Sequence, residues 1–383
     1  MNQATAKRLL FVSTHDRWAG CEELWSATAA ELARQGHSVT AFRANLDSGA
    51  DRFEALRKLG CVTIDALDAP FVGGGAIRSL GRYSPAAPLL SARFALDRAL
   101  KQAKPDLVLV SQALNIGGLH LLSRVRRSGA PYVIVCHQAG EMYWPPDDNL
   151  AELRACYSGA EFAAFVSEHN RRLTEEQLGL PIPDAVIVRN PVRAVAPLDW
   201  PGEDVIRMAC PARLYVPEKG QDILLRVLTR PKWRERPIRL SLFGDGENRR
   251  GLEAMAAALR LDNVSFPGFE PDLSAIWRDH HALALSSRVE GLPMALVEAM
   301  LAGRVPIVTA VGGSGEVVTD GATGFVAAAP TDDSFDDALE RAWSKRAEWR
   351  SIGNSAKAHI HALVPERPEL ELASMILRAA SRS

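Results

Sequence analysis

Residues 283–308, LALSSRVEGLPMALVEAMLAGRVPIV, contain one complete repeat of the fold that the sequence predicts. An apolar strand ends near Ser286, and Gly291 permits a tight turn shortly after it. Pro293 is well placed as the first residue of a helix, where its missing N–H has no helical partner in any case. A second apolar strand follows at residues 305–308. The order strand, helix, strand predicts parallel strands joined by a helix.

The same alternation recurs along most of the chain. In residues 21–35, for example, Trp25, Ala29 and Leu32 repeat at helical spacing. Near-continuous apolar strands that are separated by helices indicate parallel sheets covered on both faces. The other predicted strands are residues 9–13, 38–42, 107–110, 132–136, 162–166, 206–210, 238–243 and 264–267.

The length predicts two domains. The chain has 383 residues, whereas a single hydrophobic core usually stops growing at roughly 250–300 residues. Residues 193–204 carry two prolines and little periodicity, which is typical of a linker. We therefore expect an N-terminal domain at residues 1–192, a C-terminal domain at residues 193–367, and a further helix at residues 368–383.

Composition excludes several classes of protein. Lys and Arg total 45 against 46 for Asp and Glu, and this balance argues against a dedicated nucleic-acid binder. Five scattered cysteines indicate reduced thiols in a cytosolic protein. Neither a signal-peptide pattern nor an apolar stretch approaching the roughly 20 residues of a membrane span is present. Residues 73–104 hold six basic side chains and one acid, a pattern that fits peripheral contact with the inner membrane face or a solvated helix face.

Charged residues follow the predicted strands of the second half. Glu290 directly follows one strand, and Glu298 is the only charge between it and Arg304. Because a buried carboxylate is costly without a partner, Glu298 lies on an exposed helix edge, pairs with an Arg, or accepts hydrogen bonds from ligand hydroxyls. Arg213 and Lys219 flank another strand-to-helix turn and suit a diphosphate, although both could be solvated.

The acidic and metal-ligating residues give no metal signature. The adjacent pairs are not Asp-x-Asp motifs at a strand end, and we expect them to be solvated. The histidines and cysteines lack zinc spacing. We therefore expect neither a metal nor another cofactor. The acidic pairs are Asp147-Asp148, Asp332-Asp333 and Asp336-Asp337.

Taken in order, the motifs of residues 205–330 resemble those of retaining family 4 glycosyltransferases. Glu290 and Glu298 reproduce the E-x7-E pair of that family, and residues 311–325 resemble the segment that follows it. The resemblance implies an α/β protein with the GT-B fold: two Rossmann-like, doubly wound parallel-sheet domains that face a cleft, with the C-terminal helix crossing back to the first domain. The remaining motifs are Arg213 with Lys219-Gly220, Gly244-Asp245-Gly246, VSFPG at residues 264–268, and Gly312-Gly313 with Glu316.

The resemblance also implies roles for single residues. Glu298 would hold the ribose hydroxyls, Glu290 would contact the transferred sugar, and Arg213 with Lys219 would stabilise the leaving diphosphate. His137 stands where the family carries an active-site histidine, although a histidine after a strand can also be structural. The other implied donor contacts are Gly20, Gly244, Gly268, Phe269, Gly291, Leu292, Pro293 and Met294.

The first half matches the family more loosely. Residues 19–22 (AGCE) stand where the family has a glycine-rich loop, and Ala19 departs from its double glycine. Residues 138–144 (QAGEMYW) are polar and aromatic, and they form either an acceptor-side surface or a packed loop. Asn190 resembles the strand-end asparagine that precedes the interdomain link, and we interpret it as structural.

The predicted function is transfer of a hexosyl group from a nucleotide-diphosphate sugar to an acceptor hydroxyl, with retention and without a metal. The acceptor would be a glycan, a lipid-linked compound or a small molecule, in bacterial glycan or polysaccharide biosynthesis. One alternative is an inactive protein of the same fold that binds nucleotides or serves as a scaffold. A nicotinamide dehydrogenase is disfavoured, because residues 13–20 lack its glycine-rich fingerprint.

Overall fold

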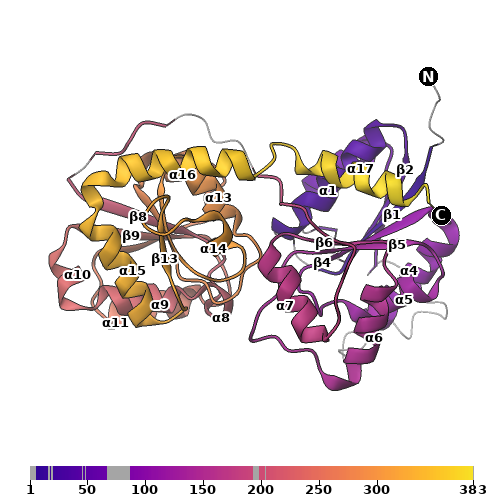
Figure 1. Cartoon of the computed structure of the whole chain (residues 1–383), viewed down its shortest axis with the longest axis horizontal. Helices are drawn as coiled ribbons and strands as arrows, with labels where there is room; N and C mark the ends of the chain where they lie inside the picture. Colours follow the sequence, from indigo (N-terminus) through magenta and orange to yellow (C-terminus); the bar gives the residue numbers. More distant parts are fainter. Residues whose placement is uncertain are drawn as a thin grey trace. The chain divides into compact units, whose positions relative to one another are not determined.

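The computed structural model describes residues 6–15, 18, 20–44, 46–47, 49–66, 87–192, 198–202 and 204–382, without the side chains of residues 87–91. Ala19, residues 73–86 of the basic stretch and part of the predicted linker lie outside the described residues. The chain forms two compact units, Met1–Pro191 with Arg367–Ser383 and Val192–Glu366 (Figure 1).

The first unit is built on a seven-stranded parallel sheet in the order β3-β2-β1-β4-β5-β6-β7. The central strands β4 and β5 are buried along their whole length, as their apolar sequences predict. Ser13 pairs with Ser111 at the carboxyl ends of neighbouring strands. The strands are β1 Arg8–Ser13, β2 Ser38–Arg43, β3 Val62–Asp65, β4 Leu107–Gln112, β5 Tyr132–Cys136, β6 Ala163–Phe165 and β7 Ala185–Ile187.

Helices cover the sheet of the first unit. The C-terminal helix α17 lies beside α1 (Figure 1), and its Leu372 and Ile376 share a core with Leu24 and Trp25. This confirms that the last helix returns to the first unit. The helices are α1 Gly20–Arg34, α2 Ala50–Lys58, α4 Ala87–Ala103, α5 Leu119–Arg127, α6 Asp147–Ser158, α7 Glu168–Leu178 and α17 Pro368–Ala379.

The second unit has a six-stranded parallel sheet in the order β10-β9-β8-β11-β12-β13. Residues 283–308 form β11, α13 and β12, which confirms the predicted strand–helix–strand repeat. Pro293, however, is the N-cap of α13 with φ −61° and ψ 121°, so it precedes the first helical residue. The strands are β8 Ile206–Pro211, β9 Ile238–Phe243, β10 Val264–Gly268, β11 Ala282–Leu285, β12 Val305–Thr309 and β13 Phe325–Ala327.

One aspartate on a helix of the second unit is buried, which the sequence did not predict. Asp336 on α15 accepts hydrogen bonds from Trp233 and Arg230 and is only 8% exposed, so the expectation that it is solvated is wrong. Basic residues after α9 neutralise it. The helices are α8 Val216–Lys219, α9 Gln221–Leu228, α10 Pro231–Glu235, α11 Arg249–Ala258, α12 Leu273–Asp279, α13 Met294–Leu301, α14 Ser314–Val317, α15 Asp332–Ser344, η1 Arg346–Glu348 and α16 Trp349–Leu363.

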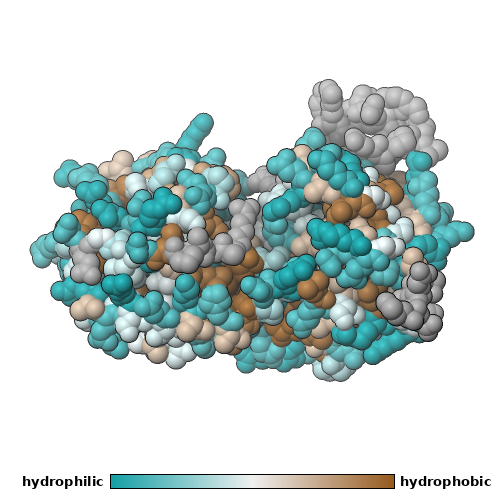
Figure 2. All heavy atoms as spheres, turned by 90° about the horizontal axis from the view of Figure 1, so that it is seen from above, coloured by the Kyte–Doolittle hydropathy of each residue, from teal (hydrophilic) through white to brown (hydrophobic). Residues whose placement is uncertain are grey.

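The face that Figure 2 shows carries many hydrophilic residues, with hydrophobic residues in smaller groups between them. Among the helices that the structure describes, none is both long and apolar enough to cross a membrane.

Candidate functional site

An ion pair joins two turns at the carboxyl edge of the second sheet. The Lys219 ammonium at the end of α8 lies 2.9 Å from Glu290 Oε1, in the turn that follows β11. The Ser287 hydroxyl donates to the same carboxylate oxygen at 2.7 Å. The side chain of Glu290 is 9% exposed and that of Lys219 18%. The structure therefore brings together two predicted site residues that are 71 positions apart.

Close backbone packing fixes these two turns against each other. Gly220 has φ +61°, and a Cβ at this position would clash with the Ser286 carbonyl. The Ser286 hydroxyl donates to the Gly220 carbonyl at 2.6 Å. Arg288 donates through both Nη atoms to the Asp222 carboxylate, at 2.8 and 2.9 Å. The turn after β11 is thus held by the start of α9, which restricts where Glu290 can point.

A third turn, after β12, supports the same site. Gly312 has φ +56°, and its α-carbon packs directly on the peptide that joins Glu290 to Gly291. The Gly313 N–H donates to the Gly291 carbonyl at 2.5 Å. Only glycine combines this backbone conformation with so close an approach. Gly312 is therefore required by its close packing on the Glu290 turn.

Glu298 lies in the second turn of α13 and is 7% exposed. The alternative of an exposed helix edge is therefore wrong. Leu292 is 6% exposed just before the helix, so the backbone between Glu290 and α13 is largely enclosed. The N-terminus of α13 carries N–H groups without a helical acceptor, which favour an anionic group.

Arg213 contacts two side chains of its own connection between β8 and α9. Its Nη2 lies 3.0 Å from Glu218 Oε2, and its guanidinium carbon lies 4.5 Å from the centre of the Tyr215 ring. The side chain is nevertheless 38% exposed. An incoming diphosphate would therefore compete with Glu218 for this guanidinium, a feature that the sequence pattern did not indicate.

The turns after β9 and β10 meet at the same edge. Gly244 has φ +115°, and a Cβ there would clash with the Ala212 carbonyl of the neighbouring turn. Its N–H donates to the Gly268 carbonyl at 2.7 Å. Phe269, which follows, is 76% exposed. These predicted donor contacts thus line the edge that also carries Arg213.

In the first unit, His137 follows β5 and is only 5% exposed. Its Nδ1 lies 3.0 Å from Asn190 Oδ1 and its Nε2 lies 3.2 Å from the Ser111 hydroxyl. Because the amide oxygen can only accept, Nδ1 carries the proton and Nε2 accepts from Ser111. Burial lowers the pKa of His137 to about 4, so the ring is neutral at pH 7.

A second buried group lies at the carboxyl end of β1. Glu22, in the first turn of α1 that Gly20 begins, accepts hydrogen bonds from Ser13 at 2.9 Å and Trp25 at 2.9 Å. Its carboxylate lies 3.3 Å from Nε of Arg43, which is fully buried. Desolvation raises the pKa of Glu22 to about 7, although the Arg43 charge opposes this shift.

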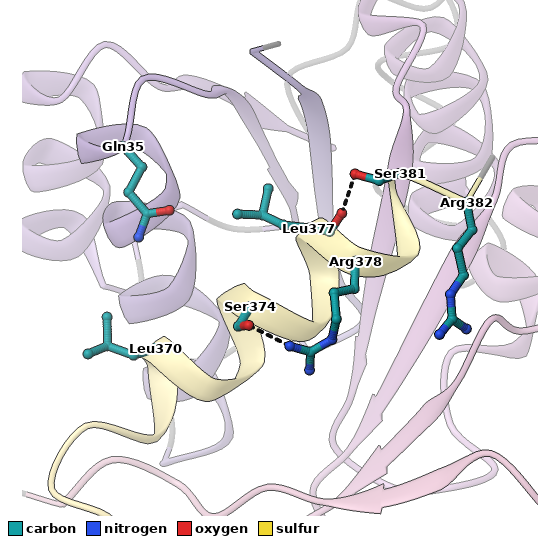
Figure 3. A pocket seen from close by; sticks show the side chains of 7 residues that line it. All are labelled: Gln35, Leu370, Ser374, Leu377, Arg378, Ser381 and Arg382. Atoms are coloured by element: carbon teal, nitrogen blue, oxygen red, sulfur yellow. Dashed lines mark hydrogen bonds between the residues drawn. The ribbon is translucent and has the colours of Figure 1, made fainter. Parts of the chain in front are cut away.

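Other features of the described residues do not add to the site. A surface pocket lies along α17 beside Gln35 (Figure 3), where Arg378 bonds to Ser374 at 2.7 Å and Ser381 to the Leu377 carbonyl at 2.8 Å. It contains none of the predicted site residues. Within the part of the chain that the structure describes, no three His, Cys, Asp or Glu side chains cluster as metal ligands would.

Both halves of the chain match glycosyltransferase families. Residues 207–359 match the family described as "Glycosyl transferases group 1", and residues 19–191 match the "Glycosyl transferase 4-like domain". These matches include the turns that carry Glu290, Lys219 and His137. The chain belongs to the family 4 glycosyltransferases.

Several known proteins are similar to this family 4 chain. A glycosyltransferase from Methanocaldococcus jannaschii is 31% identical over 30% of the chain and 31% of its own length. The GDP-mannose-dependent alpha-(1-6)-phosphatidylinositol monomannoside mannosyltransferase of Mycolicibacterium smegmatis is 30% identical over 52% of the chain and 58% of its own length. The matches thus span less than two thirds of these relatives. The solved structure of Anabaena HepE with UDP-glucose is similar over 97% of this chain and 100% of the HepE chain, with a TM-score of 0.73 and 17% sequence identity. This similarity confirms the GT-B fold.

Several residues of this site were missed by sequence reasoning. Ser111 and Asn190 orient His137 from other strand ends, whereas Glu218 holds Arg213 from within the same connection between β8 and α9. Ser111 ends a strand beside β5, which was a weak signal that it could reach this edge of the sheet. For Glu218 the only signal in the sequence was its position between Arg213 and Lys219, the two predicted cations.

Proposed function

We propose that this family 4 glycosyltransferase transfers a hexosyl group from a nucleotide-diphosphate sugar to an acceptor hydroxyl with retention of configuration. The second unit would bind the donor and the first unit the acceptor. Relatives named for GDP-mannose and a neighbour solved with UDP-glucose make guanosine and uridine diphosphate sugars the first donors to test. The setting that we propose is biosynthesis of a glycan or glycoconjugate.

The observation that supports this proposal most strongly is the joining of Lys219 and Glu290. One turn supplies a cation for a phosphate and the other a carboxylate for sugar hydroxyls, at the edge where open α/β sheets bind ligands. Glu298 is buried one helical turn into α13, where it is placed to accept hydrogen bonds from the ribose. Gly291, Leu292 and Met294, which lie between the two carboxylates in the sequence, would supply backbone N–H groups.

The proposed reaction balances without an added base. The bond between the anomeric carbon and the diphosphate breaks, the acceptor oxygen attacks from the same face, and the acceptor proton passes to the leaving phosphate oxygen. Arg213 and Lys219 stabilise the charge that develops on the diphosphate, which is worth most where water is excluded. Neutral His137, whose ring Asn190 and Ser111 orient, would belong to the acceptor side of the proposed reaction. These cations take the place of a divalent metal in the proposed mechanism.

A panel of nucleotide sugars tests the proposal. A donor present at 100 times its dissociation constant should stabilise the protein by about 2.7 kcal/mol in thermal unfolding. Release of nucleoside diphosphate from that donor would separate an enzyme from an inactive binding protein of the same fold, which binds but does not turn over. Failure of every nucleotide sugar to bind would refute the proposed function.

A further inference from the structure

The segment between β5 and α6 exposes two large apolar side chains just after His137. Trp144 is 63% exposed and Met142 is 54% exposed, whereas Pro145 beside them is buried. Few large hydrophobic side chains among the described residues are this exposed. An exposed tryptophan at the carboxyl edge of a parallel sheet, next to a candidate active-site residue, is a typical ligand contact.

A buried polar network holds the backbone of this segment. Gln177 on α7 donates through Nε2 to the carbonyls of Gly140 at 3.0 Å and Tyr143 at 3.1 Å. The Asn115 side chain donates to Gln177 Oε1 at 2.7 Å, and its backbone N–H donates to the Gln138 carbonyl at 2.9 Å. Asn115 and Gln177 are at most 2% exposed.

This network has a consequence for the exposed side chains. Buried amides are expensive unless their hydrogen bonds are made, and when they are made they impose one backbone conformation. The peptide groups on both sides of Met142 are therefore fixed, and Trp144 projects from a rigid segment. A rigid aromatic surface loses little conformational entropy when a ligand covers it.

The polar surroundings indicate what kind of ligand fits. Glu141 lies 3.0 Å from His169 Nε2, and their hydrogen bond lowers the pKa of Glu141, so the carboxylate stays ionised. Asp147 and Asp148 are exposed at the start of α6. These acids repel anionic lipid and phosphate. Carboxylates accept hydrogen bonds from hydroxyl groups, and an indole face packs on the apolar C–H face of a sugar ring.

We propose that Glu141, Met142 and Trp144 form an acceptor subsite in which a pyranose ring stacks on the Trp144 indole. This assigns a carbohydrate as the acceptor and rests on the proposed function. The Glu141 carboxylate accepts hydrogen bonds from ring hydroxyls, Met142 covers the edge of the ring, and His137 lies at the start of the same segment.

Saturation-transfer NMR tests the subsite with methyl glucopyranoside, methyl galactopyranoside and methyl mannopyranoside as probes. Wild-type protein should bind at least one of them with one face of its ring saturated. Trp144→Ala should weaken that binding about tenfold, because the covered apolar area is lost, and Trp144→Phe should retain most of it. Phe94→Ala, which truncates another exposed aromatic side chain on α4, is the matched control and should bind as wild type does.

Donor hydrolysis, measured on the same samples, separates this inference from the proposed function. Phe94→Ala, which lies outside the proposed subsite, should hydrolyse donor at the wild-type rate. Absence of pyranoside binding by wild type, or equal binding by Trp144→Ala, would overturn the subsite. Binding to phosphatidylglycerol vesicles that Trp144→Ala abolishes, without pyranoside binding, would assign the surface to a membrane and also overturn it. If the wild-type protein binds a pyranoside but turns over no donor, only the proposed function would be refuted.

Discussion

Replacing Gly312 by Ala should damage the candidate site without touching any of its side chains. Gly312 has φ +56°, and a Cβ would lie 2.4 Å from the Glu290 carbonyl oxygen, whereas real Cβ atoms essentially never approach closer than 3.0 Å. Relief of this clash requires the Glu290–Gly291 peptide to move by about half an ångström. The left-handed conformation costs alanine about 1 kcal/mol, and with the clash the total loss of stability is about 2–4 kcal/mol.

The displacement should also reduce turnover. A shift of this size in a positioning group lowers the rate about 10- to 100-fold. The rate is measured as release of nucleoside diphosphate at saturating donor, and the stability is measured by thermal unfolding of the same samples. Gly315→Ala is the matched control, because nothing lies within 4 Å of a Cβ there and α14 tolerates alanine well. Wild-type stability and turnover in Gly312→Ala, or equal losses in both variants, would refute the packing argument.

Three further predictions concern single charged or titratable groups. Glu298→Gln should weaken nucleotide-sugar binding in calorimetry while the melting temperature stays near that of wild type; unchanged affinity would remove Glu298 from the site. Lys219→Met should lower turnover more than it lowers binding of the bare nucleoside, with Lys219→Arg as the charge-keeping control, and equal losses of both would contradict a role on the phosphate. Since the folded pKa of His137 is about 4, the unfolded chain binds a proton below pH 6.5 that the folded chain does not, so stability falls as the pH falls. Between pH 7 and pH 5 the free energy of unfolding of His137→Gln should therefore fall by about 2 kcal/mol less than that of wild type. Urea unfolding at each pH measures this difference, and equal pH dependence in the two proteins would contradict it.

Much of the fold was predictable because it depends on local patterns. Apolar runs such as residues 132–136 and 238–243 are strands, since a sheet covered on both faces needs unbroken apolar strands. The strands β3, β7 and β13 escaped this reasoning, because each lies at a sheet edge and has only three or four residues. Pro293 was misplaced by one position, since proline suits the N-cap as well as the first helical turn.

The sequence named candidate residues but not how they pair. Strand ends and the spacing of Glu290 and Glu298 pointed to turns that the structure brings to one edge of the second sheet. Whether Lys219 meets Glu290 depends on how turns from different strands pack together. Whether Arg213 is held by Glu218 depends on how the connection between β8 and α9 folds. Asp336 shows the same limit, because the basic residues that bury it come from elements about one hundred positions earlier.

The central claim is that this chain transfers a sugar with retention and without a divalent metal. The most direct measurement is proton NMR of donor turnover by purified protein in excess EDTA, which follows the anomeric signal of the first product. The account predicts that turnover continues in EDTA and that the product first appears with the anomeric configuration of the donor. A product of opposite configuration, or turnover that EDTA abolishes and magnesium or manganese restores, would contradict it.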